Sequence, residues 1–292
     1  MFAEEWPLMM FTLLTQLAVG SFFMLVLIRS LLVKTEQKEA NRFLQFGVKA
    51  VGVTMGIALV FSLFHLGTPS GAYRSILNLG SSWLSREILT AGGFFVLWLV
   101  TYLQFRNGSY SSVLGWITSL VGLLAIYSMA SIYATSIRPA WDNANTYLAF
   151  YGTTFLFGSV GATLSLLCGK KGTNFSDESL SALKKVSIIG LVAVIIPLIY
   201  LPLFISSLNG GNSAAIASAQ LLSGNYAFPL AFRWILSVVG GILLAYFIAK
   251  LSKKQAVSGN MLYLAFATII LGEFIGRYVF YASAVSIMVG IQ

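Results

Sequence analysis

The chain alternates long apolar runs with short polar segments. A helix that crosses the bilayer core needs about 20 predominantly apolar residues. Backbone polar groups in lipid must be satisfied within the segment, so such runs predict helices, whereas barrel strands would be shorter and would alternate in polarity. We therefore expect an all-α, polytopic transmembrane helix bundle of about eight spans. The expected spans cover residues 8–32, 43–66, 87–105, 112–134, 147–168, 184–206, 229–250 and 260–288.

Composition supports this interpretation. Hydrophobic residues make up 58% of the 292-residue chain and charged residues only 9%, whereas soluble domains carry about 25% charged residues. A soluble protein so poor in charge would expose large apolar patches. No long polar stretch separates the runs, so we expect one transmembrane domain over residues 1–292. Glu4 and Glu5 stand where a cleavable signal peptide would carry basic residues, so we expect the first run to remain as a span.

Basic residues are concentrated in alternate connections between the runs. The opposite connections carry only Arg74, Arg86, Arg138 and Arg233. The positive-inside rule therefore places both termini on the non-cytoplasmic side. The formal net charge of +9 then reflects topology and contact with anionic membrane lipid, and no nucleic acid partner is expected. The first, third, fifth and seventh connections carry Arg29, Lys34, Lys38, Arg42, Lys49, Arg106, Lys170, Lys171, Lys184, Lys185, Lys250, Lys253 and Lys254.

Two ionisable side chains near the outer ends of spans are the first candidates for function, because such groups are costly at membrane depth. His65 is the only histidine and ends the second span, where it can exchange a proton near neutral pH. Glu87 opens the third span, so one connection brings both residues to the same outer surface. An imidazole and a carboxylate at one depth could bind a ligand that has two oxygens and releases protons.

Each of these residues also has a purely structural interpretation. His65 could donate a hydrogen bond to a helix-end carbonyl. Glu87 could favour the positive end of the helix dipole, with Ser85 as the N-cap. Arg74 and Ser75 lie in the connection between them, and they could hold a ligand head group, contact a partner or simply be solvated.

The last span carries a second pair of ionisable residues. Glu273 and Arg277 are four residues apart, a spacing that places them on one helix face and is typical of a structural ion pair. Alternatively, both residues form a polar wall of the ligand cavity or a route by which protons leave. Tyr281 follows one turn further out and would extend that route.

Composition disfavours several resident cofactors. Cys168 is the only cysteine, so the chain cannot by itself form a disulfide, ligate an iron–sulfur cluster or build a Cys-based zinc site. One histidine cannot provide both axial ligands of a bis-histidine membrane haem. The sequence also lacks a phosphate-binding Gly-Lys-Ser/Thr loop, a nucleophile elbow and a cluster of metal ligands. We therefore expect no haem, metal or iron–sulfur cluster in this chain.

Three blocks of residues resemble the membrane-anchor subunit of bacterial dimethyl sulfoxide reductase, the DmsC-type family. The resemblance covers nearly the whole chain, and the blocks occur in the family's order on the corresponding spans. The blocks are EWPLM at 5–9 with Phe11, Thr12 and Gln16; HLGTP at 65–69, continuing to Glu87 and Ile88; and LGE at 271–273 with Ile275, Gly276, Arg277, Phe280 and Tyr281.

The resemblance implies a three-subunit complex of anaerobic respiration in the bacterial inner membrane. A molybdopterin catalytic subunit would reduce a sulfoxide or N-oxide, and an iron–sulfur subunit would relay electrons to it. The anchor would oxidise menaquinol, a lipid-soluble substrate, without catalysing the terminal reduction itself. In the family the histidine of the His-Leu-Gly block, here His65, is tied to quinol binding. Glu87 is its expected partner, and Arg74 and Ser75 complete the expected quinol-binding set.

Topology and resemblance together predict where the complex forms. Both termini and the His65 end of the bundle would be periplasmic, and the iron–sulfur partner would dock there so that electrons travel a short distance. Two other functions remain open from the residues alone. A transporter would place Glu273 and Arg277 in a central substrate path, although no internal repeat is evident. A purely structural anchor would have a degenerate quinol site.

Overall fold

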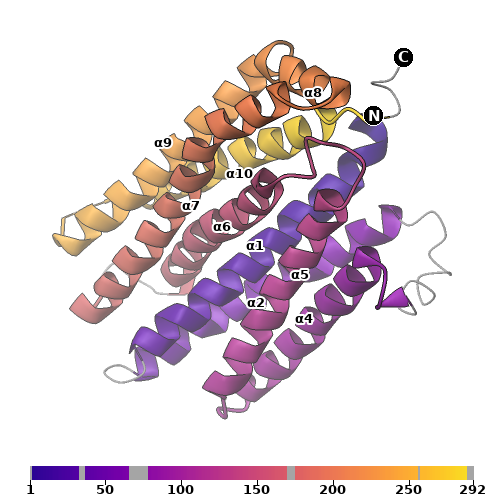
Figure 1. Cartoon of the computed structure of the whole chain (residues 1–292). Helices are drawn as coiled ribbons and strands as arrows, with labels where there is room; N and C mark the ends of the chain where they lie inside the picture. The colour runs from indigo at the N-terminus through magenta and orange to yellow at the C-terminus, as the bar shows by residue number, and fades with distance from the viewer. Residues whose placement is uncertain (1, 33–36, 66–77, 170–174, 256, 288–292) are drawn as a thin grey trace.

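The computed structural model describes residues 2–32, 37–65, 78–169, 175–255 and 257–287, with the backbone alone at 2–5, 37–40, 42–44, 65 and 169. Within these ranges the chain is all-helical and contains no strand. The helices, shown in Figure 1, are α1 (Phe2–Leu32), α2 (Gln37–His65), α4 (Trp83–Arg106), α5 (Ser112–Ala134), α6 (Ala144–Gly169), α7 (Asp177–Asn209), α8 (Ser213–Ser223), α9 (Ala227–Ser252) and α10 (Gly259–Ala282).

The prediction of about eight spans is confirmed. Among the described residues, eight helices are long and apolar enough to cross a membrane, and each coincides with one expected run. Several helices begin a few residues before the expected run, and serine caps mark the earlier starts of α4 and α7. The last helix is shorter than expected, because α10 ends at Ala282. Ser176, for example, caps α7 by accepting a hydrogen bond from the Ser179 N–H at 3.2 Å. Asp177 and Glu178 then occupy the first turn, where the helix dipole favours carboxylates.

The short helix α8 was not expected from the sequence. It lies within residues 207–228, which are rich in glycine, serine, asparagine and alanine and therefore predict a connection between spans. Asn212 caps α8, and its Oδ1 atom accepts a hydrogen bond from the Ala215 N–H at 2.9 Å. One face of α8, including Ala219 and Leu222, is buried against the bundle. Burial of small side chains therefore stabilises a helix whose composition alone resembles a connection.

The first helix lies at the centre of the bundle. In its most apolar window, 78% of α1 is buried, and it packs against α2, α5, α6, α7 and α10. Figure 1 shows α1 running between a group formed by α2, α4 and α5 and a group formed by α6, α7, α9 and α10. Gly20 of α1 and Gly158 of α6 meet backbone to backbone, and a Cβ atom on either glycine would collide with the other helix. Small residues at such crossings let transmembrane helices approach closely.

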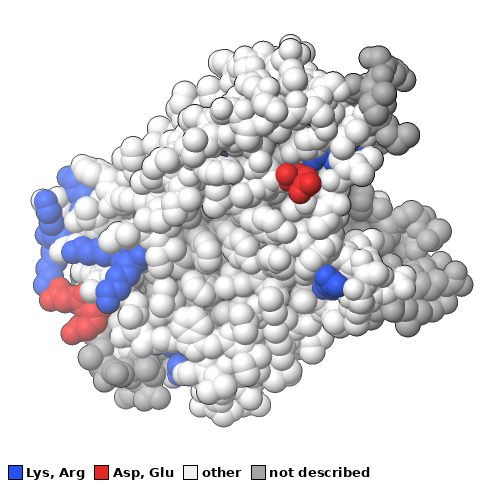
Figure 2. All heavy atoms as spheres, in the orientation of Figure 1, with Lys and Arg blue, Asp and Glu red and all other residues white. Residues whose placement is uncertain are grey.

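The two ends of the bundle differ in charge. The start of α1 and the end of α10 lie at one end, together with the end of α2 and the start of α4 (Figure 1). Basic residues gather at the opposite end (Figure 2), where α6 connects to α7 and α9 connects to α10. The side of the membrane on which each end lies stays a prediction.

Candidate functional site

Glu87 is buried inside the bundle, with only 5% of its surface exposed. The prediction that Ser85 caps α4 is wrong, because the cap is Ser82, whose Oγ accepts a hydrogen bond from the Ser85 N–H at 3.3 Å. The helix begins at Trp83, so Glu87 lies in its second turn. Stabilisation by the helix dipole falls off within the first turn. The dipole therefore does not explain why a carboxylate occupies this buried position.

Two buried tyrosines from other helices lie near this carboxylate. Tyr133 of α5 and Tyr281 of α10 form a hydroxyl–hydroxyl hydrogen bond of 2.8 Å, and both phenols are buried. The Glu87 carboxylate lies within electrostatic range of both hydroxyls. Thr12 of α1 lies beside the Tyr281 hydroxyl. No hydrogen bond joins the Glu87 carboxylate to another described residue.

The structure brings the backbone of His65 and Glu87 to the same end of the bundle. His65 is the last residue of α2 and Glu87 lies near the start of α4 (Figure 1). The side chain of His65, and Arg74 and Ser75 entirely, lie outside the described residues. Their role in quinol binding therefore stays a prediction, as does a shared cavity between His65 and Glu87.

Glu273 forms an ion pair, but with a different partner from the one its spacing suggests. Its Oε2 atom lies 3.1 Å from Nη2 of Arg233 on α9, and no ion pair joins it to Arg277. Thr153 donates a hydrogen bond to Oε2 at 2.5 Å, and Ser237 donates one to Oε1 at 2.8 Å. The assignment of Arg233 to an outer connection is therefore wrong, because this residue lies inside α9 and is only 11% exposed.

Arg277 is buried separately from this ion pair. Its Nη2 atom donates a hydrogen bond of 2.9 Å to Oε1 of Gln16, whose Nε2 donates in turn to the Phe150 carbonyl at 3.1 Å. The guanidinium also stacks over the Phe150 ring, 3.8 Å from its centroid. Arg277 lies within electrostatic range of the Tyr133 and Tyr281 hydroxyls. Both phenols thus lie within electrostatic range of Arg277 and of Glu87.

Sequence reasoning missed most partners of these ionisable groups. Gln16 could have been proposed as a partner from the sequence, because it is the only amide side chain in α1. Thr153 and Ser237 could not, because serine and threonine are common along all the spans. Tyr133 also gave no signal, since tyrosines occur near many helix ends.

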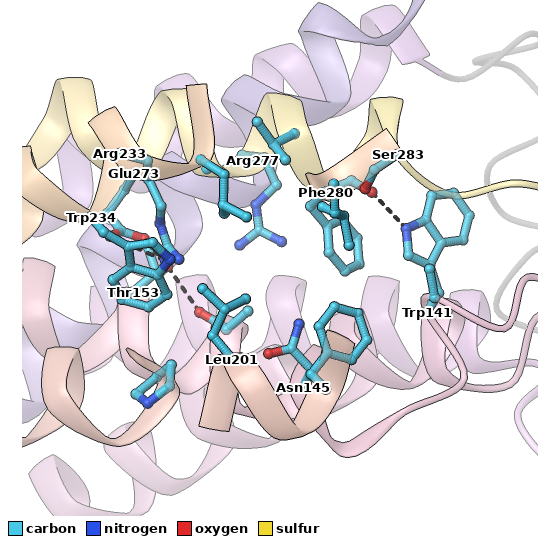
Figure 3. Close-up of a pocket in the computed structure, with 18 residues that line it drawn as sticks. Trp141, Asn145, Thr153, Leu201, Arg233, Trp234, Glu273, Arg277, Phe280 and Ser283 are labelled. Carbon is cyan, nitrogen blue, oxygen red and sulfur yellow. Dashed lines mark hydrogen bonds and ion pairs between the residues drawn. The ribbon is translucent and has the colours of Figure 1, made fainter. Parts of the chain in front are cut away.

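A small cavity lies beside Glu273 and Arg277 and is enclosed by α6, α7, α9 and α10 (Figure 3). Its volume is about 60 Å³, roughly the space of two water molecules. Glu87 is not among the residues that line it. A part for Glu273 and Arg277 in the ligand cavity or in a proton route therefore stays a prediction. Among the described residues, no three His, Cys, Asp or Glu side chains come together as metal ligands would.

Comparison with known proteins gives consistent relatives over nearly the full length. Residues 1–283 match the family model described as DMSO reductase anchor subunit (DmsC). The protein is 29% identical to the C subunit of anaerobic dimethyl sulfoxide reductase from Haemophilus influenzae over 282 residues, covering 95% of this protein and 94% of the relative. Over 288 residues it is also 29% identical to the subunit of that name from Escherichia coli, with the same coverage. The YnfH subunit of anaerobic dimethyl sulfoxide reductase from Escherichia coli is 26% identical over 283 residues.

Proposed function

Because this chain belongs to the DMSO reductase anchor subunit (DmsC) family, we propose that it oxidises menaquinol on behalf of a membrane-bound reductase complex. The chain is a multi-pass membrane protein and an anchor subunit, which family membership and the eight candidate spans establish together. The proposal adds the bacterial inner membrane as its location. It also adds an iron–sulfur subunit and a molybdopterin catalytic subunit as its partners. Family membership favours this role over the transporter alternative.

The observation that carries the proposal is the burial of Glu87 without a hydrogen-bond partner among the described residues. An intramembrane carboxylate is a functional candidate by default, because its charge is costly at that depth. Menaquinol has two hydroxyl groups on an apolar ring, and its oxidation to menaquinone releases two protons and two electrons. In the proposed site His65 forms a hydrogen bond with one hydroxyl, and Glu87 accepts the proton of the other. The first hydroxyl loses its proton through His65 to the same aqueous side, and both electrons pass to the iron–sulfur partner.

The electrons must leave the chain at the same end. A single cysteine and a single histidine cannot hold a cluster or a bis-histidine haem within this chain. The acceptor is therefore an iron–sulfur cluster of the partner, docked over the end of α2 and the start of α4. With that end periplasmic, protons are released and electrons are consumed on the same side. Turnover is then close to electroneutral.

Two substitutions test this function in the assembled complex. His65→Arg removes the proposed hydrogen bond to the quinol, and Glu87→Gln removes the proton acceptor while keeping the side chain's size. Each variant should lose menaquinol-dependent sulfoxide reduction. Each should retain reduction driven by an artificial donor such as reduced benzyl viologen, because that donor bypasses the quinol site.

The artificial donor also controls for assembly, since its activity requires an intact complex on the membrane. Normal menaquinol turnover in the His65→Arg variant would remove His65 from the site. Normal turnover in the Glu87→Gln variant would remove Glu87 as the proton acceptor. Loss of both activities would point to failed assembly, and the milder His65→Gln variant would then test the site through its affinity for a quinol-analogue inhibitor.

A further inference from the structure

The cavity beside Glu273 is lined by residues with buried hydrogen-bond donors that lack partners. Nη1 of Arg277, Nε of Arg233 and Nε1 of Trp234 are each buried, and none bonds to another described residue. All three residues line the cavity. Figure 3 shows the Arg277 guanidinium pointing into the space, with the side-chain amide of Asn145 facing it from α6. Buried polar groups in native proteins are almost always satisfied, so an unsatisfied set indicates a bound water or ion.

The charges around this cavity do not balance. Two guanidinium groups, from Arg233 and Arg277, face one carboxylate, from Glu273. Both oxygens of that carboxylate are already occupied by Arg233, Thr153 and Ser237. Arg277 donates a hydrogen bond to the neutral amide of Gln16 and lies over the Phe150 ring. It forms no ion pair with a described carboxylate, in a part of the protein where charge is costly.

The chemical type of the unpaired groups limits which ligands could occupy the cavity. A water molecule accepts two hydrogen bonds but must also donate two, and the three unpaired groups here are all donors. An anion accepts from every donor and also neutralises the remaining charge. The volume of about 60 Å³ is about twice the share of one water molecule in the liquid, so the space accommodates a monatomic ion.

We propose that this cavity is a binding site for a small monovalent anion of the halide class, with chloride as its probe. Nη1 of Arg277 and Nε1 of Trp234 donate hydrogen bonds to the ion, and Arg233 contributes charge and its Nε–H. These donors lie on α9 and α10, and Asn145 of α6 faces Arg277 across the cavity. This site does not depend on quinol oxidation, because Glu87 does not line it.

Binding of ³⁶Cl⁻ to the purified complex in chloride-free gluconate buffer, at constant ionic strength, tests the proposal. The wild-type complex should bind one chloride per anchor subunit saturably, and bromide should displace it. Trp234→Phe removes one donor but keeps an aromatic ring, so chloride affinity should fall about tenfold, the factor that corresponds to about 1.4 kcal/mol. Arg277→Met removes the unpaired charge and should abolish binding.

A matched control is Arg106→Gln, which removes an arginine from the end of α4 at the basic end of the bundle, away from the cavity. This variant should bind chloride as the wild type does. Absence of saturable binding in the wild type overturns the proposal and leaves water as the occupant. Unchanged affinity in Trp234→Phe also overturns it, because the ion would then lie elsewhere. Since Trp234→Phe keeps the packing of the site, the test stands even if Arg277→Met fails to assemble.

Discussion

Neutralising Glu273 should destabilise the bundle strongly. Glu273→Gln keeps the shape of the side chain but removes the charge that faces Arg233 at 3.1 Å. The variant leaves two buried guanidinium groups without an acid partner, and it weakens the hydrogen bonds from Thr153 and Ser237. Removing one partner of a buried ion pair costs about 3–5 kcal/mol, because the other charge stays buried and uncompensated.

Thermal unfolding of the detergent-solubilised anchor complex measures this effect. For chains of 150–250 residues, each kcal/mol shifts Tm by about 2–4 °C, so a loss of several degrees or more is expected. A matched control is the exposed pair between Lys254 and Asp177, whose charged atoms lie 3.9 Å apart with side chains 78% and 81% exposed. Lys254→Gln should leave Tm unchanged, because exposed ion pairs contribute little.

A double-mutant cycle isolates the pair itself. Arg233→Met removes the cation while keeping apolar packing, and the double variant Glu273→Gln, Arg233→Met should recover part of the stability lost by either single change. Partners in contact show coupling of about 0.5–3 kcal/mol, whereas independent sites add within about 0.5 kcal/mol. Additive losses in the cycle would refute the ion pair as the source of stability.

Three further changes test other parts of the structure. Tyr281→Phe and Tyr133→Phe each remove one hydroxyl near Glu87. Each variant should slow menaquinol-dependent turnover several-fold, with benzyl viologen activity as the measure of an intact complex. Unchanged quinol kinetics would show that the phenols are not part of the site. Gly158→Val places a branched side chain where α6 meets α1, so membranes should contain little anchor by immunoblot, and wild-type levels would show that the crossing tolerates a side chain. Cys168, an exposed thiol near the basic end of α6, should react with an impermeant maleimide in inverted vesicles and not in intact spheroplasts, and the opposite pattern would reverse the topology.

The spans were predictable because the bilayer imposes one simple requirement on sequence. A run such as 112–134 must be apolar along its whole length, and α5 has those bounds in the structure. Helix α8 escaped prediction because its stability comes from a buried face of alanine and leucine, not from overall hydrophobicity. The cap of α4 was misplaced because Ser82 and Ser85 are chemically equivalent in sequence, and only backbone geometry distinguishes them.

The site was predictable in its residues but less so in its contacts. Glu87, Glu273 and Arg277 stand out because ionisable groups are rare in apolar runs. Their partners depend on which helices pack together, and a spacing of four residues reveals only neighbours on the same helix. The Glu273 partner is Arg233 on α9, and the partner of Arg277 is Gln16, 261 residues away. Neither contact can be inferred from the spacing of residues along one helix.

The central position of α1 has a consequence for biosynthesis. Helix α1 leaves the ribosome before the neighbours that enclose it, and Gln16 bonds to Phe150 and Arg277, which follow 134 and 261 residues behind it. Until α6 and α10 enter the membrane, the Gln16 amide lacks these two hydrogen-bond partners and lies in lipid or beside an insertion factor. A nascent chain interrupted before α10 therefore displays an unsatisfied polar group in α1, which is a feature that membrane quality-control proteases can recognise.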